Sequence, residues 1–158
     1  MMYLNNERKN KISYSLLTVI YKFSENDKQT RYYGTDTPLF SSEIHMIRAI
    51  KEEEGIHITG LANKLGVTKG AVSQIVNKLD KKGFIKKETD LHNQSKLIIK
   101  LTPKGEIADT NHKKLHNKFD ALINGILKDA SNEEIAFLKN FLNKVEERIE
   151  DFEEKITE

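Results

Sequence analysis

Polar side chains recur at helical spacing near the middle of the chain. They comprise Thr68, Lys69, Gly70, Ser73, Gln74, Asn77 and Lys78, with the apolar residues Val72, Ile75, Val76 and Leu79 on the opposite predicted face. Glutamine and asparagine can bond bidentately to adenine, serine can bond several base edges, and lysine can meet guanine or phosphate. A glycine lets the start of a helix approach the phosphate backbone closely. The pattern predicts a helix that reads the DNA major groove, and an ordinary solvated helix face is the alternative.

A second group with possible chemistry is the pair His112 and His116, four residues apart in a segment of helical periodicity. Residues at this spacing face the same way on a helix, and two such imidazoles can bind one zinc ion together. Hydrogen-bonded structural histidines are the alternative. The chain has no cysteine, which excludes disulfides, cysteine-based zinc sites and thiol redox sensing.

The polar face needs a scaffold, and its flanking sequence predicts a helix-turn-helix. A short helix over Thr59–Leu65, a tight turn at Gly66 and a longer helix over Thr68–Lys82, capped by Thr68, fit that motif. Two strands, 84–89 and 96–101, flank a polar turn and predict a hairpin wing. The wing adds these candidate DNA-binding residues: Lys86, Lys87, Asn93, Gln94 and Lys96.

The ends of the chain predict amphipathic helices. We expect one over about 5–27, one capped at Ser41, one from Pro103 to about Lys128, and one that opens at a capping box beginning with Ser131. The last repeats apolar residues at alternating spacings of three and four, which is typical of a coiled-coil seam. These stripes predict packing against a second copy of the chain; an intrachain helical hairpin is the alternative.

Together these elements predict a mainly α fold with a small β-hairpin wing, an α/β winged helix-turn-helix. We expect an N-terminal dimerisation helix and linker (1–40), a DNA-binding domain (41–102) and C-terminal dimerisation helices (103–158). Between residues 56 and 101 nine lysines face three acidic residues, whereas residues 129–158 carry ten acidic and four basic ones. A basic middle with an acidic tail suits a polyanion-binding module on a separate element, although two solvated faces would look the same.

The sequence lacks the motifs that mark secreted proteins, membrane proteins and several classes of enzyme. The sequence shows neither the apolar stretch of a signal peptide nor an apolar run long enough for a membrane span, so we expect a cytoplasmic protein with no membrane partner. It holds no phosphate loop, dinucleotide fingerprint or Gly-x-Ser-x-Gly elbow, so we do not expect an enzyme.

The run from Ile58 to Ile85, with Leu101-Thr102-Pro103-Lys104-Gly105 after the wing, resembles the core of the MarR family of bacterial and archaeal regulators. The resemblance covers the whole chain in helix order. It implies a homodimer that binds a pseudo-palindromic operator in double-stranded DNA, usually as a repressor, under the control of a small ligand or metal ion. A winged-helix module that binds protein without specific DNA readout is the alternative function.

The resemblance also bears on the wing and on zinc. Family wings commonly carry minor-groove arginines after an aspartate that matches Asp90, whereas this chain has Gln94 and Ser95 there, which weakens the expected wing readout. In the zinc-responsive branch, zinc ligands match His45, His112 and His116. Further carboxylate candidates are Asp27, Glu25 and Glu43.

Overall fold

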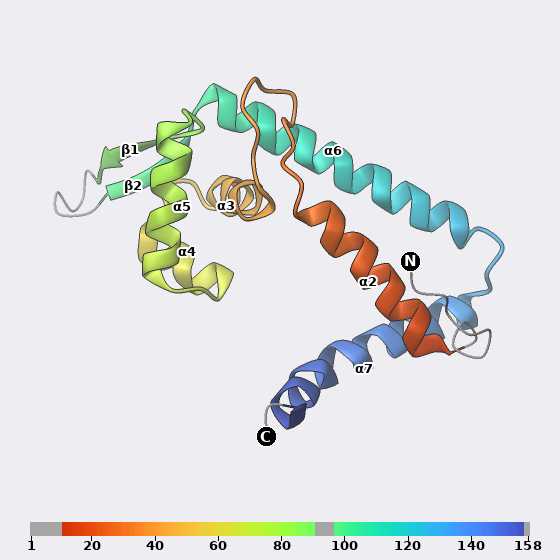
Figure 1. The fold of residues 1–158 in the computed structure, drawn as a ribbon. Coiled ribbons are helices and arrows are strands. Elements are labelled where there is room, and N and C mark those ends of the chain that lie inside the picture. The colour runs from red at the N-terminus through yellow and green to blue at the C-terminus, as the bar shows by residue number, and fades with distance from the viewer. Residues whose placement is uncertain (1–10, 91–96, 157–158) are drawn as a thin grey trace. The chain divides into compact units, whose positions relative to one another are not determined.

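We analysed a computed structural model that describes residues 11–90 and 97–156, with the backbone alone for 26–27 and 150–156. The elements in chain order are α2 (Ile12–Asp27), α3 (Ser41–Glu52), α4 (Ile58–Leu65), α5 (Lys69–Lys81), β1 (Ile85–Thr89), β2 (Leu97–Leu101), α6 (Pro103–Ile126) and α7 (Asn132–Ile156) (Figure 1). This order confirms the expected mainly α, winged helix-turn-helix fold. The expected start of the first helix, residues 5–10, lies outside the described residues.

By their contacts the residues form two compact units, Met1–Lys114 and Leu115–Glu158, and α6 crosses from one into the other. The core lies in the first unit. It collects apolar side chains from α3, α4, α5, the wing and the start of α6, and its fully buried members include Leu39, Ile47, Leu61, Val72, Val76, Leu79, Phe84 and Ala108. Removing these side chains from water fixes the inner face of α5, so its polar face must point outward.

Two of the expected helix starts have the predicted caps. Thr68 Oγ1 accepts a hydrogen bond from the Ala71 backbone N–H at 3.2 Å, ahead of α5. Ser131 and Glu134 form the predicted reciprocal capping box at the start of α7, with bonds of 2.7 and 3.2 Å. Each cap satisfies backbone donors that a helix start leaves without a partner.

The expected cap of α3 by Ser41 is wrong. Ser41 is the first residue of the helix, and the residue before it, Phe40, occupies the cap position without a side-chain cap bond. The Glu43 carboxylate instead accepts a hydrogen bond from the Phe40 backbone N–H at 2.8 Å. An acidic third residue therefore completes this helix start, because it reaches back where phenylalanine has no oxygen to offer.

The wing is an antiparallel pair with a register from Ile85↔Leu101 to Thr89↔Leu97. Both strands are confirmed, with β1 beginning one residue later than expected. The Ile99 backbone N–H donates to the Ile56 carbonyl at 3.1 Å, which attaches β2 to the segment before α4. In Figure 1 the hairpin lies beside α5.

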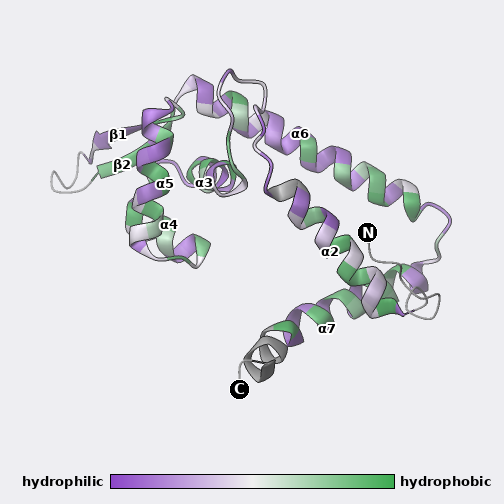
Figure 2. Cartoon of the chain, in the orientation of Figure 1, coloured by the Kyte–Doolittle hydropathy of each residue, from purple (hydrophilic) through white to green (hydrophobic). Residues whose placement is uncertain are grey.

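In the second unit the helices carry apolar residues that remain exposed in the single chain. They include Leu122, Ile126, Phe137, Leu142 and Ile149. Figure 2 shows apolar and polar residues alternating along α7. Among the described residues, no helix combines the length and apolar character that crossing a membrane requires.

Candidate nucleic-acid interface

The outward face of α5 holds the predicted reading residues. Its exposed members are Lys69, Gly70, Gln74, Asn77 and Lys78, and Ser73 is half-buried. Beneath them Val72, Val76 and Leu79 have no exposed surface. Within the part of the chain that the structure describes, no hydrogen bond or ion pair engages the side chain of Gln74, and the same holds for the side chains of Lys69 and Lys78. These groups are therefore available to a partner outside the chain.

Asn77 differs because a wing lysine holds its amide. The Lys87 Nζ donates to Asn77 Oδ1 at 2.7 Å and lies 3.0 Å from Asp80 Oδ2. With the amide oxygen engaged, the Asn77 NH2 group is oriented and remains free to donate. The Lys87 charge is largely balanced by Asp80, so Lys87 suits the positioning of Asn77 better than direct phosphate contact.

The other wing cations share one carboxylate. Lys86 and Lys100 are opposite one another in the strand register, and both ammonium groups pair with Glu88, at 2.5 and 2.7 Å. Lys100 first, and then Lys86, lower the pKa of the Glu88 carboxyl to about 2. Lys100 was not among the predicted DNA-binding residues, since only the strand register reveals its place. Asn93, Gln94 and Lys96 lie outside the described residues.

Gly70 is not required by the fold. A Cβ added there would meet only the Thr68 hydroxyl, at 3.9 Å, and Gly70 does not have a positive φ. The Ala71 and Val72 backbone N–H groups are held by Thr68, and the glycine leaves the remaining first-turn N–H groups, those of Lys69 and Gly70, uncovered and open to an anion.

His57, which the sequence did not single out, joins the wing to α4. Its Nδ1 lies 2.9 Å from the Leu97 carbonyl oxygen, and its Nε2 lies 3.3 Å from Asp90 Oδ2. Leu97 begins β2 and Asp90 follows β1, so the ring reaches both ends of the wing loop. No sequence motif marks this contact, because it depends on where the hairpin docks.

The three histidines among the six predicted metal ligands differ in burial and in their contacts. The rings of His45 and His112 approach edge to face, with centroids 5.3 Å apart, and the Tyr33 ring also meets His112 edge to face, at 5.7 Å. His112 is buried, whereas His45 and His116 are exposed. Two of the six candidates are thus brought together.

The carboxylate candidates are engaged elsewhere or not described. Glu43 is 2% exposed and pairs with Lys82 Nζ at 2.7 Å. Glu25 pairs with Lys28 at the surface, also at 2.7 Å, and the Asp27 side chain lies outside the description. Among the described residues, no cluster of three or more histidine, aspartate or glutamate side chains could hold a metal ion.

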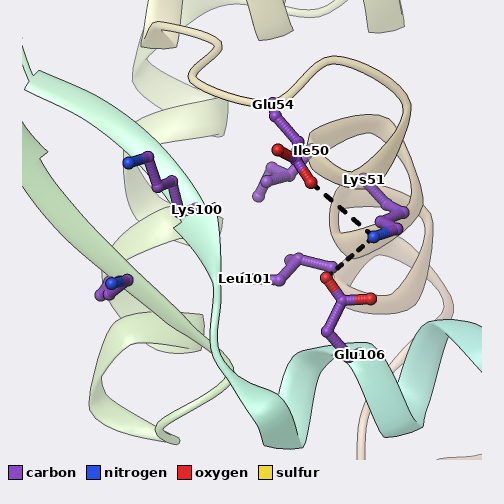
Figure 3. A pocket seen from close by; sticks show the side chains of 7 residues that line it. Ile50, Lys51, Glu54, Lys100, Leu101 and Glu106 are labelled. Atoms are coloured by element: carbon purple, nitrogen blue, oxygen red, sulfur yellow. Dashed lines mark hydrogen bonds and ion pairs between the residues drawn. The ribbon is translucent and has the colours of Figure 1, made fainter.

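A pocket of about 190 Å³ lies where α3, the wing and α6 meet in the first unit. In Figure 3, Lys51 bridges Glu54 and Glu106, with N–O distances of 3.8 and 3.0 Å. Its remaining lining comprises Ile50, Lys86, Lys100 and Leu101. Each of the three amino groups has a carboxylate partner, so the pocket offers no unbalanced cation to an anionic ligand.

Comparison with known sequences identifies relatives among HTH-type transcriptional regulators. The family model described as the MarR family matches residues 39–95. The HTH-type transcriptional regulator PchR of Bacillus subtilis is 31% identical over 73% of this chain and 68% of its own. The uncharacterized HTH-type transcriptional regulator YhjH of the same organism is 30% identical over 66% of this chain. The match to YhjH spans only 60% of that relative's length.

Solved structures share the fold. FabT of Streptococcus pneumoniae, solved in complex with DNA, has a TM-score of 0.67 and 26% identity, over 94% of this chain and 99% of FabT. ZitR of Lactococcus lactis, a zinc-responsive member of the MarR family, has a TM-score of 0.71 and 22% identity, over 89% of this chain and 98% of ZitR.

Proposed function

The chain belongs to the MarR family of transcriptional regulators, and we propose that it binds a pseudo-palindromic operator in duplex DNA as a homodimer, with one α5 in each major groove. The observation that carries the proposal is the division of α5 between a buried apolar face and an outward face rich in amide, hydroxyl and amino groups. We propose that a protein with this function acts in the cytoplasm.

The polar residues of α5 would contact different parts of the DNA according to their side chains. Gln74 and Asn77 can donate to and accept from base edges, and Ser73 can bond a base or a phosphate. Lys69 and Lys78 supply charge for the backbone, and Gly70 opens the helix start to a phosphate. The Thr68 hydroxyl oxygen already accepts the cap bond from Ala71, so its hydrogen and its second lone pair remain for DNA.

The wing would contribute less than α5. Lys86 shares Glu88 with Lys100, and Lys87 is held by Asn77 and Asp80, so these cations must leave or share a carboxylate to meet a phosphate. For the loop we retain Asn93, Gln94 and Lys96 as proposed contacts, from the sequence alone. Without arginine there, sequence preference from the minor groove should be small.

The proposed dimer uses the terminal helices, residues 1–40 and 103–158. Exposed apolar side chains recur along α2, α6 and α7, among them Phe23, Leu122, Ile126 and Phe137. Leaving such stripes in water is unfavourable, and a second copy buries the same stripes symmetrically. Light scattering during chromatography tests this directly, since a strict monomer would contradict the dimer.

We propose further that the protein acts through binding and not through catalysis, as a repressor where its operator overlaps a promoter. The competing function, a winged-helix module that binds protein without reading DNA, fits the polar α5 poorly, because protein-binding faces usually expose apolar or aromatic anchors.

The deciding experiment selects bound duplexes from a random library at fixed salt. We expect an enriched sequence with two-fold symmetry and a higher affinity for it than for random duplex. Equal affinity for the two would refute specific readout. The double variant Gln74→Ala with Asn77→Ala provides the matched control and should no longer enrich the same site.

Zinc is the second candidate, as an effector, and the meeting of His45 with His112 favours it. Two imidazoles in contact are the ligand type that zinc prefers, and His116 lies one turn further along α6 as a third. The buried Glu43 would first have to give up Lys82, whereas Glu25 would give up only a surface ion pair with Lys28. Glu25 or Asp27 is therefore the better fourth candidate. Bound zinc would supply a fixed cross-link between these residues. ZitR is zinc-responsive, but a likeness at 22% identity shows the fold alone.

Calorimetric titration with zinc tests this proposal independently of DNA. We expect one site per chain, lost in His112→Ala and kept in the control His92→Ala, which replaces a histidine outside the proposed ligand set. Absence of binding near micromolar zinc in the parent protein would eliminate the idea.

A further inference from the structure

The end of α5 is attached to the start of α3 by a charged side chain. Lys82 is the C-cap residue of α5, and its Nζ lies 2.8 and 2.7 Å from the two carboxylate oxygens of Glu43, in the first turn of α3. The same amino group donates to the Pro38 carbonyl at 3.0 Å. One side chain therefore binds α5 to two segments that lie 39 and 44 residues earlier in the chain.

The partners of this carboxylate make the attachment specific. Glu43 Oε2 also accepts a hydrogen bond from the Phe40 backbone N–H at 2.8 Å, and the Lys82 ammonium lies 5.6 Å from the centre of the Phe40 ring. The Glu43 side chain is only 3% exposed. A buried carboxylate is costly unless a cation and hydrogen bonds compensate it, so Glu43 requires Lys82 at this place. Few relative positions of α3 and α5 satisfy that requirement.

The loop before α3, which also receives the cation of α5, is itself held in place. Leu39 is fully buried and forms a backbone bridge with Arg31, with N–O distances of 3.0 and 2.9 Å. Lys104 of α6 donates to the Thr37 hydroxyl at 2.7 Å. The Pro38 carbonyl thus lies between two anchored residues, and the end of α5 is bound to a fixed support.

The apolar face of α5 sets which side of the helix is buried, but it does not fix the helix along its axis. Val72, Val76 and Leu79 have no exposed surface. Hydrophobic contacts are non-directional, whereas a hydrogen bond tolerates only a few tenths of an ångström in its length. Gln74 needs that accuracy to meet base edges. It lies about 12 Å along the helix from Lys82, at 1.5 Å per residue, so fixing the end of α5 also fixes this side chain.

We infer that Lys82 is a positioning residue for DNA reading, because its bond to Glu43 fixes the end of α5 relative to α3. The place where Gln74 and Asn77 meet the bases then depends on this pair, although neither member of the pair contacts DNA. The part of the inference that concerns DNA rests on the proposed function, whereas the attachment of α5 does not.

Two variants break the pair without leaving an unpaired charge in the core. Glu43→Gln removes the carboxylate, and the Lys82 side chain, which is 27% exposed, can turn to water. The double variant Glu43→Gln with Lys82→Met removes both charges, and the glutamine oxygen can still accept from the Phe40 backbone N–H. Lys81→Met is the matched control, because it removes an exposed lysine at the adjacent position.

The first test measures amide hydrogen exchange in the free protein. The Lys82 and Gly83 backbone N–H groups donate to carbonyls within the last turn of α5, at 3.0 and 2.9 Å. Corrected for intrinsic rates and compared with Leu61 of α4, they should exchange about five- to ten-fold faster in both variants, as expected for loss of a partly exposed charged bond. Lys81→Met should match the parent. Unchanged relative exchange in both variants overturns the attachment, even if no operator is ever found.

The second test compares affinity for the selected operator with affinity for random duplex, at a temperature where circular dichroism shows each variant to be folded. Both variants should lose about ten-fold in the ratio of the two affinities, comparable to the loss of one base contact, mainly through weaker operator binding. Lys81→Met should keep the ratio of the parent. An unchanged ratio in the folded variants means that the pair only stabilises the fold, and it overturns positioning.

Direct phosphate contact by Lys82 predicts a different pattern. Glu43→Gln would then free the ammonium and tighten binding to both duplexes, and the double variant would reduce the salt slope by about one. That result contradicts positioning. Absence of any preference for an operator in the parent protein would refute the proposed function and leave the exchange test to decide on the attachment of α5.

Discussion

Replacing Lys87 by methionine separates two roles for the wing, phosphate contact and control of Asn77. The Lys87 amino group lies 2.7 Å from Asn77 Oδ1 and 3.0 Å from Asp80 Oδ2, and its side chain is 26% exposed. A hydrogen bond to a charged group contributes about 1.5–3 kcal/mol, and partial exposure reduces this. We therefore expect Lys87→Met to weaken binding to the selected operator by about 1–2 kcal/mol.

The assay is a double-mutant cycle with Asn77→Ala, measured by fluorescence anisotropy on the operator and on random duplex. Contacting residues couple by about 0.5–3 kcal/mol, so Lys87→Met should cost little further affinity once Asn77 is gone. The salt dependence should change much less than the slope of about one that the loss of a phosphate contact causes.

A matched control removes the same charge from the same surface. Lys81→Met lies at the end of α5, where Lys81 is exposed. Additive losses in the cycle, equal losses on operator and random duplex, and a salt slope reduced as in Lys81→Met would refute the positioning role of Lys87. Lys87 would then be an ordinary phosphate contact.

Three further results are expected. Gln74→Ala should weaken operator binding by about 1–3 kcal/mol and leave binding to random duplex nearly unchanged, because Gln74 is exposed and available to bases; equal losses would argue against base reading. Lys100 and Lys86 lower the pKa of the Glu88 carboxyl to about 2. The folding stability that Glu88 contributes is therefore present above about pH 4.5 and is lost as the pH falls through about 2. Urea unfolding should show a shallower acid loss in Glu88→Gln, and an unchanged pH profile would count against this ion pair. Gly105→Ala should lower the unfolding free energy by about 1–3 kcal/mol or more, because its Cβ would clash with the Phe84 carbonyl oxygen; an unchanged melting temperature would contradict that clash.

Local sequence periodicity was sufficient to predict the helices and the polar face of α5. Val72, Val76 and Leu79 mark the buried side within one short segment, so the position of Gln74 on the opposite side follows from helix geometry alone. The cap by Thr68 is equally local, since the oxygen and its donor are three residues apart. The prediction of Ser41 as a cap failed because the helix begins one residue earlier, where the Glu43 carboxylate in the first turn accepts from the Phe40 backbone N–H.

The tertiary structure decided which polar groups meet. Glu43, predicted as a metal ligand, is bound to Lys82 39 residues further along, and His57 reaches Leu97 across 40 residues. Lys87 meets Asn77 because β1 docks beside α5, and Lys100 meets Glu88 through the strand register. Hydrophobic spacing determines which face of an element is buried, but it does not determine how the element slides or turns against its neighbour. Because a hydrogen bond tolerates only a few tenths of an ångström in its donor–acceptor distance, such contacts form only once the core has placed the elements.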